Sequence, residues 1–448
     1  GILVGFPIAA AKNGGGAFLF IYALFVILIC LPIMMAEMAV GRHTNKDPLG
    51  AYKAISGNDP KWKIAGWLGV ITPFMIAVFY MVITVWIFGY LFQAVTGDLA
   101  ALADPNNFGE FINGKSLFIY MVVVVAITGA ILMSGVKQGI ERAAKVLMPS
   151  LFVLLVALVI YVLTLDNALA GVAFYVIPDF SKIDGAVISS ALSQAFFSLS
   201  LGMGILLTYG SYMSKKQDVV DSSKLVALTD TGVAFVAGLM ILPAIFSFDP
   251  NVNTEELSES SVELIFVLLP KIFLSLQMDI GYFGASAVAS IFFLLVFFAA
   301  ITSLVSIIEV PNAAIIDELE IDRKKSLTIL ALAMVFLSVL ASMSFGMAGW
   351  LTNFVSYAGA DKSLFDVIYD IFYDTILPLN GLFICLFVIY RWKTANFNNE
   401  LMEGVSDGSH KFLLKYSDIA LKTFIPVILA IVFINTVAIK FFGHHLFF

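Results

Sequence analysis

Serine and glycine residues interrupt an apolar segment near the middle of this chain. Residues 191–213 are otherwise apolar enough to cross a membrane, but their centre reads FFSLSLGMG, residues 196–204. A helix that unwinds there exposes backbone carbonyls, serine hydroxyls and the ends of two half-helices. The oxygens would suit a small alkali cation, and the N-terminal end of a half-helix attracts an anionic group such as a carboxylate. A helix kink or a packing face of small residues is the alternative interpretation.

A second group of hydroxyl residues lies in the apolar stretch FFAAITS, residues 297–303. Thr302 and Ser303 place adjacent hydroxyls on one helical turn, and the carbonyl of Ala299 lies one turn back. A cage of hydroxyl and carbonyl oxygens without formal charge suits Na⁺. The alternative is the common hydrogen bond from a serine or threonine hydroxyl to its own helix.

Several other polar side chains lie inside or near apolar segments. Asp230, within LTDTGVAF, is a functional candidate because a carboxylate near a membrane interior is costly. Its alternative is a solvated position near the cytoplasmic end of the segment. Tyr80 could donate its hydroxyl to a substrate carboxylate, although an ordinary core tyrosine is at least as compatible with the sequence. For Glu37 and Glu309 we expect structural pairing with helix ends or arginines rather than substrate contact.

The composition indicates the class of protein that must position these groups. Of the 448 residues, 60% are hydrophobic and 13% are charged. Soluble domains carry about 25% charged residues. Apolar runs of about 18 residues or more recur along the whole length, which is typical of a polytopic helical membrane protein. No Lys/Arg-rich block suggests nucleic-acid binding, and the four histidines, in loops or at span ends, argue against an intramembrane HExxH metal enzyme.

The hydropathy pattern predicts an all-α protein with eleven membrane spans. They lie at about residues 1–12, 16–41, 64–96, 115–134, 139–164, 187–213, 222–248, 283–315, 325–345, 365–391 and 413–443. Lysine and arginine gather in the loops after the even-numbered spans, whereas the alternate loops lean acidic. By the positive-inside rule the basic loops are cytoplasmic. We therefore expect a cytoplasmic N-terminus, a C-terminus outside, and further residues before Gly1 that complete the first span.

Two of these spans contain residues that would break a helix. The first contains Gly1, Gly5 and Pro7, and the sixth contains Gly202 and Gly204. Broken spans five apart would occupy matching positions in two five-helix halves, which are inverted relative to each other because five is odd. This arrangement is typical of transporters with discontinuous helices at their binding site. It predicts a first repeat over 1–164, a second over 187–391 and an additional span over 413–443.

Stretches along nearly the whole chain resemble the neurotransmitter:sodium symporter family, especially its eleven-span bacterial amino-acid branch. Besides FFSLSLGMG they are FPIAAAKNGGGAF (6–18), LPIMMAEMAVGR (31–42), SGVKQGIERAAKVLMP (134–149), PDFSKI (178–183), TYGSY (208–212) and FFAAITSLVSIIEVP (297–311). The resemblance implies two inverted five-helix repeats with discontinuous spans 1 and 6. It also implies alternating access around a central site.

The resemblance further implies which residues form a central amino-acid site. Gly1 would offer its backbone, and Tyr80 its hydroxyl, to the substrate carboxylate, while Ser200 would meet the amino group. The side-chain pocket would be lined by Ile76, Ile83, Phe197, Met203 and Ile307. Phe197 and Tyr80 would close the outer side of this pocket. Such a lining fits an apolar substrate side chain, branched or aromatic.

The resemblance also places two sodium sites beside the pocket. Ala299, Thr302 and Ser303 match the second site, and Ser198 and Asp230 match parts of the first. We therefore expect Na⁺ as the coupling ion. Because Asp230 stands where many relatives have asparagine, its carboxylate could restore attraction for a cation or could carry a proton instead.

The sequence departs from the family pattern at several gate and ion positions. Ile2 replaces the asparagine that ligates the first sodium ion, and Gly5 replaces an arginine of the outer gate. The acidic partner of that arginine lies near Asp370, which the sequence leaves without a mate. Ala234 stands where chloride-independent relatives often have an acidic group, a negative charge that Asp230 could supply, so chloride dependence stays open.

The leading interpretation is a transporter rather than an enzyme. It would be a sodium-coupled symporter, multi-pass in a prokaryotic cell membrane, that takes up an amino acid by alternating access. Its partners would be the small amino acid and the lipid bilayer, and no nucleic acid. The alternatives are a proton-coupled or sodium-independent amino-acid transporter, a channel, and a transport-impaired relative that acts as a sensor or scaffold.

Overall fold

The computed structural model describes residues 3, 5–134, 140–249, 252, 261–405, 410–444 and 446, with the backbone alone at 140–144, 146 and 261–265. Up to residue 211 its elements are α1 (Gly5–Lys12), α2 (Gly16–Phe25), η1 (Val26–Cys30), α3 (Leu31–Thr44), α4 (Pro48–Ser56), α5 (Pro60–Thr96), α6 (Leu99–Leu102), α7 (Asn107–Ile112), α8 (Ser116–Ser134), α9 (Ile140–Val162), α10 (Ala168–Val176), η2 (Phe180–Lys182), α11 (Gly185–Ser198) and α12 (Ile205–Ser211).

The second half of the chain is also almost entirely helical. Its elements are α13 (Val219–Phe248), α14 (Ser261–Ser275), α15 (Gln277–Leu319), α16 (Arg323–Met343), α17 (Gly349–Thr352), β1 (Val355–Tyr357), β2 (Ala360–Lys362), α18 (Leu364–Ile368), η4 (Tyr369–Ile376), α19 (Leu377–Leu386), η5 (Phe387–Trp392), α20 (Thr394–Met402), α21 (Lys411–Lys422) and α22 (Phe424–Phe442). The predicted all-α class is therefore confirmed.

Eight helical segments of the described chain are long and apolar enough to cross a membrane. They are 16–44, α5, α8, α13, α15, α16, 364–392 and α22. Each overlaps a predicted span, which confirms a polytopic helical membrane fold. The remaining predicted spans fall on α1, on α9 and on the pair α11 and α12.

Two backbone interruptions that hydropathy does not mark lie beside or within predicted spans. Gly281, within α15, has φ 74° and ψ 165°, so regular helix begins after it, close to the predicted start at 283. Thr423 has φ −118° and ψ −84° and separates α21 from α22. The predicted eleventh span is thus divided into two helices, and only α22 is both long and apolar enough to cross a membrane.

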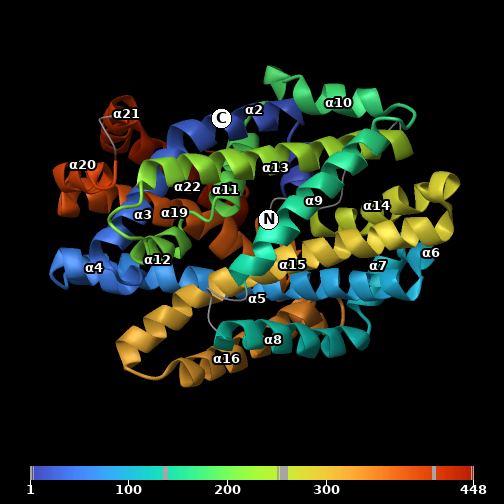
Figure 1. Ribbon diagram of the computed structural model, residues 1–448, viewed down its shortest axis with the longest axis horizontal. Coiled ribbons are helices and arrows are strands. Elements are labelled where there is room, and N and C mark those ends of the chain that lie inside the picture. The colour runs from blue at the N-terminus through green and yellow to red at the C-terminus, as the bar shows by residue number, and fades with distance from the viewer. Residues whose placement is uncertain are drawn as a thin grey trace.

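The molecule is elongated, and several of its short helices lie at two opposite ends (Figure 1). One end carries α4, α20 and α21, and the other carries α6, α7, α10 and α14. Between them α5 and α15 lie side by side through the centre of the bundle (Figure 1).

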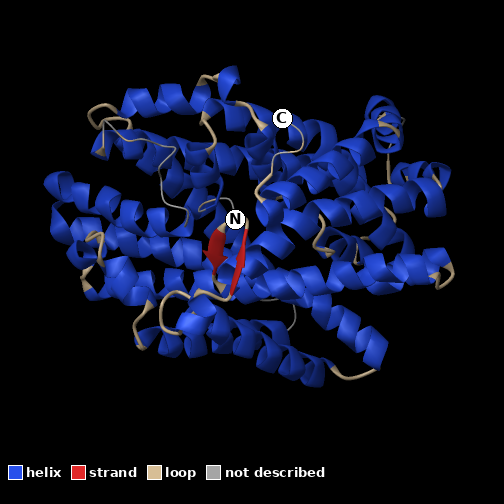
Figure 2. Cartoon of the chain, turned by 180° about the vertical axis from the view of Figure 1, so that it is seen from behind, coloured by secondary structure: helices blue, strands red, loops and turns tan. Residues whose placement is uncertain are grey.

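One small sheet interrupts the helical architecture. In the described residues β1 and β2 form an antiparallel hairpin in which Tyr357 lies opposite Ala360 (Figure 2). Ala358 and Gly359 both have positive φ, 52° and 80°, as a tight two-residue hairpin turn requires. The sequence did not predict these strands. The hairpin packs against α18 through β2 and against α22 through β1. It therefore links the start of the 364–392 segment to the last helix.

The helix break predicted at FFSLSLGMG is present. α11 ends at Ser198 and α12 begins at Ile205. Ser200, Gly202 and Gly204 have φ of 58°, 71° and 67°, so three of the intervening residues are in the left-handed region. A Cβ on Gly202 would lie 2.5 Å from the carbonyl oxygen of Leu377, so glycine is required both by conformation and by space.

Substitution of Gly202 tests this packing directly. Gly202→Ala is expected to destabilise the protein by about 1–3 kcal/mol, because a side chain in the left-handed region is strained and the new methyl group meets backbone. The measurement is the midpoint of thermal unfolding of the detergent-solubilised protein. Gly129→Ala in α8, where a Cβ meets no atom within 4 Å, is the matched control and should not lower the midpoint. Equal midpoints for both variants would contradict the assignment.

Candidate functional site

A half-buried carboxylate, that of Asp230, lies beside the N-terminal side of the helix break. The Ser198 hydroxyl, at the end of α11, donates to Oδ2 of Asp230 on α13 at 2.5 Å. The Tyr22 hydroxyl on α2 lies 3.4 Å from the same oxygen. The two residues predicted for the first sodium site are therefore in direct contact. Tyr22 was not predicted, because it lies in an unremarkable apolar run, 208 residues before Asp230.

The hydroxyl residues on α15 occupy a single turn, as predicted. The Thr302 hydroxyl donates to the carbonyl of Ala299 at 3.0 Å, which is the back-bond considered as the alternative. This bond uses the hydroxyl proton and leaves oxygen lone pairs to accept or coordinate. Ser303 is exposed although it lies well inside a helix of 43 residues, so its hydroxyl is accessible.

A chain of contacts links α15 to the second half of the broken helix. The Ser306 hydroxyl donates to the carbonyl of Thr302 at 3.0 Å. It also lies 2.7 Å from the Tyr209 hydroxyl on α12. The turn that carries the predicted second sodium site is thus held to the helix that follows the break. Tyr209 and Ser306 were not singled out from the sequence.

Most of the predicted pocket residues have buried side chains. Ile76, Met203 and Ile307 are buried, whereas Ile83 is half-buried. Phe197 is half-buried, and Ser200 lies within the break itself. Gly1 and Ile2 lie outside the described residues.

Aromatic side chains surround the predicted lid, Phe197. Its ring centroid lies 6.3 Å from that of Tyr80 and 4.7 Å from that of Tyr373 in η4. The Tyr373 hydroxyl donates to Oε1 of Gln194 on α11 at 2.8 Å. The two predicted gate residues, Tyr80 and Phe197, are therefore neighbours. Tyr373 joins them to η4, a contact that the sequence did not predict.

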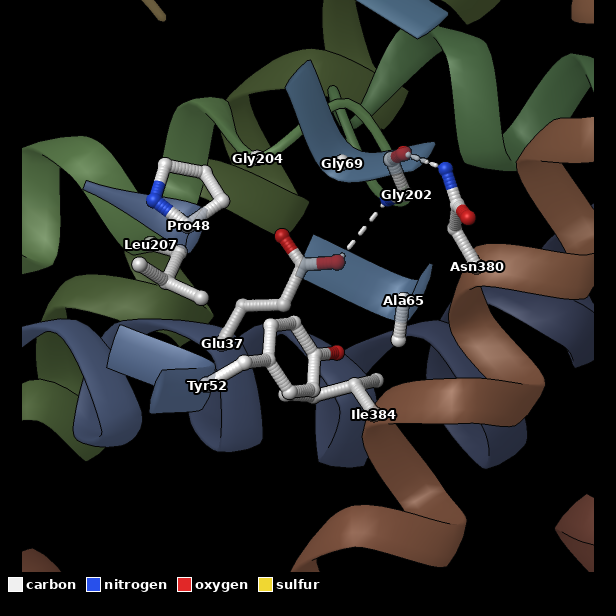
Figure 3. A pocket seen from close by; sticks show the side chains of 10 residues that line it. All are labelled: Glu37, Pro48, Tyr52, Ala65, Gly69, Gly202, Gly204, Leu207, Asn380 and Ile384. Atoms are coloured by element: carbon white, nitrogen blue, oxygen red, sulfur yellow. Dashed lines mark hydrogen bonds between the residues drawn. The ribbon is translucent and has the colours of Figure 1, made fainter. Parts of the chain in front are cut away.

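Side chains satisfy both polar groups of Gly202 in the break. Oε1 of Glu37, on α3, accepts from the Gly202 N–H at 2.8 Å, and the Asn380 amide, on α19, donates to the Gly202 carbonyl at 2.7 Å. Figure 3 shows these two side chains approaching Gly202 from different helices around a cavity of about 20 Å³. A non-helical peptide in a membrane span needs such partners. Glu37 therefore has the structural role that the sequence predicted, and Asn380 was missed.

Glu309 also pairs as predicted. Its two carboxylate oxygens accept from the Arg323 guanidinium at 2.8 and 2.7 Å, a bidentate arrangement. The guanidinium also donates to the carbonyl of Leu132 at 3.0 Å. This cluster ties the end of α8 to α15 and α16.

The expectation that Asp370 lacks a mate is wrong. Nζ of Lys440, in the last turn of α22, lies 3.1 Å from Oδ1 of Asp370 and 2.7 Å from Oδ2 of Asp374. Gly5, where the family arginine was expected, instead faces Gln194: an added Cβ would lie 3.4 Å from its Oε1. A cation supplied 70 residues later in the chain thus pairs with the carboxylate that the resemblance places near the outer gate.

The opposite end of the molecule carries a second buried ion pair. Arg42, which is fully buried at the end of α3, has its Nε 2.8 Å from Oε1 of Glu400 on α20. Lys215 and His43 also contact the Glu400 carboxylate, at 2.7 and 3.1 Å. Burial opposes ionisation of Glu400. The hydrogen bonds from Lys215, Arg42 and His43 nevertheless hold its pKa below the usual range.

Helices interrupted in mid-span allow a membrane protein to bind small solutes with backbone groups, so the fold and the site indicate a membrane transporter. The comparisons agree. The model of the sodium:neurotransmitter symporter family matches residues 1–110 and 107–445, and the chain belongs to this family, which is a family of transporters and not of enzymes.

Relatives and a solved structure support the same assignment over nearly the full length. An uncharacterized sodium-dependent transporter of Bacillus subtilis is 32% identical over 441 residues, covering 98% of this chain and 93% of the relative. One of Methanocaldococcus jannaschii is 36% identical over 332 residues, covering 70% and 65%. The crystal structure of MhsT in complex with L-phenylalanine superposes with a TM-score of 0.86 at 36% identity, covering 96% of this chain and 94% of that one.

The lowered pKa of Glu400 predicts how stability changes with pH. A carboxyl group whose pKa is lower in the folded than in the unfolded state stabilises the fold above its unfolded pKa. This stabilisation is lost as the pH falls through the folded value. The unfolding midpoint should therefore hold between pH 7 and about pH 5 and fall below about pH 4.

Substitution of Glu400 isolates its share of that pH dependence. Glu400→Gln should lower stability at pH 7 by about 2 kcal/mol, because buried Arg42 loses its counter-charge, and should flatten the decline in acid. Glu318→Gln is the matched control, since its pair with Lys53 is partly exposed and contributes at most ~1 kcal/mol. An unchanged acid decline in Glu400→Gln would contradict the assignment.

Proposed function

We propose that this chain is a sodium-coupled symporter that takes up an amino acid with an apolar side chain by alternating access. The observation that carries the proposal is the contact between Ser198 and Asp230 at the break, 2.5 Å long, because it brings a carboxylate to unwound backbone inside the bundle. Support also comes from the relatives named as sodium-dependent transporters and from the similar fold bound to L-phenylalanine.

Two places in the protein have the oxygen donors that Na⁺ requires. The turn of α15 offers the Ala299 carbonyl and the hydroxyls of Thr302 and Ser303, and we assign it the second ion. The Ser198 hydroxyl and the Asp230 carboxylate belong to the first. A full negative charge at Asp230 strengthens attraction for a cation near a low-dielectric interior. The Asp230 carboxylate would also supply the negative charge that chloride-independent relatives often have at the position of Ala234. Transport would then not need chloride.

The substrate would lie between the break and α5. Its carboxylate would accept from Tyr80 and the backbone at Gly1, and its amino group would meet Ser200. Ile76, Met203 and Ile307 are buried apolar side chains that suit an apolar substrate group. Methionine adapts its shape, so the pocket would accept more than one such group.

Transport would follow from closing and opening the two ends in turn. Sodium bound at Thr302 and Ser303 would hold the first span against α15 with the outer side open. Substrate would then bring Phe197 and Tyr80 together, and opening of the cytoplasmic side would release Na⁺ first. Residues 1–164 and 187–391 would move as the two inverted repeats, with the N-terminus cytoplasmic and the C-terminus outside.

Proton coupling is the second candidate, and the same contact favours it. Asp230 accepts from two hydroxyl groups and could exchange a proton during the cycle. Ion replacement separates the two candidates. Uptake driven by a pH gradient and indifferent to Na⁺ would favour the proton.

Uptake by reconstituted protein tests the proposal. Proteoliposomes with an inward Na⁺ gradient should accumulate tritiated apolar amino acids, L-phenylalanine among them, and should not do so when K⁺ replaces Na⁺. A single charge moving through 100 mV is worth about 2.3 kcal/mol, enough to drive accumulation. Saturable uptake that is equal in both media would contradict sodium coupling. Flux without saturation would favour a channel, and no flux for any amino acid would favour a sensor or scaffold.

The double variant Thr302→Ala with Ser303→Ala tests the ion site. It should reduce Na⁺-stimulated uptake roughly tenfold or more, because the site loses two of its oxygen ligands. Ser290→Ala is the matched control on the same helix, since its hydroxyl makes a similar back-bond, to the carbonyl of Ser286 at 2.7 Å. An unchanged dependence on Na⁺ in the double variant, with normal expression, would refute the assignment.

A further inference from the structure

Three charged side chains meet where α22 ends beside η4. Nζ of Lys440 lies between two carboxylates that are four residues apart, at 3.1 Å from Asp370 and 2.7 Å from Asp374. Both aspartates are buried, and the Lys440 side chain is 37% exposed. A single ammonium group therefore neutralises part of a doubly negative surface on η4. Two unpaired carboxylates at this spacing would repel each other.

The hairpin contributes a fourth group to this cluster. The Tyr357 hydroxyl, at the end of β1, donates to Oδ2 of Asp370 at 2.8 Å. Asp370 thus accepts from α22 through one oxygen and from the hairpin through the other. We call Lys440, Asp370, Asp374 and Tyr357 the outer charge cluster. It joins η4, α22 and the hairpin.

The outer charge cluster is continuous with the aromatic lid. Tyr369 and Tyr373 alternate with the two aspartates along η4, and their rings stack at 4.3 Å between centroids. Tyr373 in turn packs on Phe197, at 4.7 Å, and hydrogen-bonds Gln194. A displacement of η4 away from α22 would therefore carry Tyr373 away from the lid. The cluster and the lid belong to the same short π-helical segment.

We propose that Lys440 is the latch of the outer gate: by pairing with Asp370 and Asp374 it makes α22 part of the element that closes over the central site. Gly5 has no side chain to supply such a charge from α1, so the closing interaction comes from the last helix instead. This inference rests on the proposed transport function. Lys440 acts through η4 and Tyr373, and it is a positioning residue rather than a substrate ligand.

A reporter cysteine in the predicted pocket tests the latch in the absence of substrate. Ile83 is half-buried and follows Tyr80 by three residues on α5. Intact cells that express Ile83→Cys would be treated with a membrane-impermeant methanethiosulfonate reagent in a medium that contains NaCl. The native Cys30 and Cys385 are both 0% exposed, and protein without the reporter supplies their background. The quantity measured is the rate of modification at position 83.

Loss of the Lys440 charge should open the outer side. Lys440→Gln should raise the modification rate roughly fivefold or more, because the carboxylates lose their partner. Lys440→Arg should restore the wild-type rate, since it keeps the charge. Lys422→Gln is the matched control and should leave the rate unchanged, because its pair with Asp418, at 2.7 Å, lies on the surface away from η4.

A second variant keeps the inference open to refutation should Lys440→Gln fail to fold. Tyr357→Phe removes one hydrogen bond from the cluster on a partly exposed hairpin and should raise the rate about twofold to threefold. A wild-type rate in Lys440→Gln would overturn the latch, and so would a wild-type rate in Tyr357→Phe if Lys440→Gln does not fold. An increase in the modification rate of Lys440→Arg equal to that of Lys440→Gln would also overturn the latch. Sodium-driven uptake by the wild type, measured separately, shows whether the proposed function itself has failed.

Discussion

Residues 199–204 leave the α-helical pattern inside the membrane-spanning part of the protein, and no lipid can hydrogen-bond the backbone that this exposes. The surrounding helices are placed to meet that need. Glu37 from α3 and Asn380 from α19 take the N–H and the carbonyl of Gly202. Close backbone approach at Gly202 then requires a residue without a side chain. The unwound peptide is thus held by partners that lie more than 160 residues away in the chain.

Charged groups at the two ends frame this central break. At one end Arg42 and Glu400 join α3 to α20 across 358 residues, and at the other Lys440 joins α22 to η4. In both arrangements a buried carboxylate pairs with a cation. Such an ion pair stabilises the protein only while both partners are present. Removal of either partner would leave an uncompensated charge in a buried position, which is strongly destabilising.

The sequence predicted the break, because two glycines and two serines close together inside an apolar span are a visible sign of a weakened helix. It also predicted that Glu309 pairs structurally. Asn380 and Tyr22 escaped notice because each makes its contact with a residue far away in sequence, and neither type is unusual at its position. Lys440 was missed for another reason: a lysine at a span end is the ordinary pattern of a side chain that reaches toward the interface. Consequently Asp370 was expected to be unpaired.

The central claim is that an ion and the substrate bind around the break, the ion at Ser198 and Asp230 and the substrate at Ser200 and Met203. Hydrogen–deuterium exchange of peptides covering 195–205 tests it, in KCl, in NaCl, and in NaCl with L-phenylalanine. Exchange at the break should become progressively slower as Na⁺ and then the amino acid are added. The unrelated end helix α20 should exchange at a constant rate. Unchanged exchange at 195–205 under conditions that support uptake would contradict the central claim.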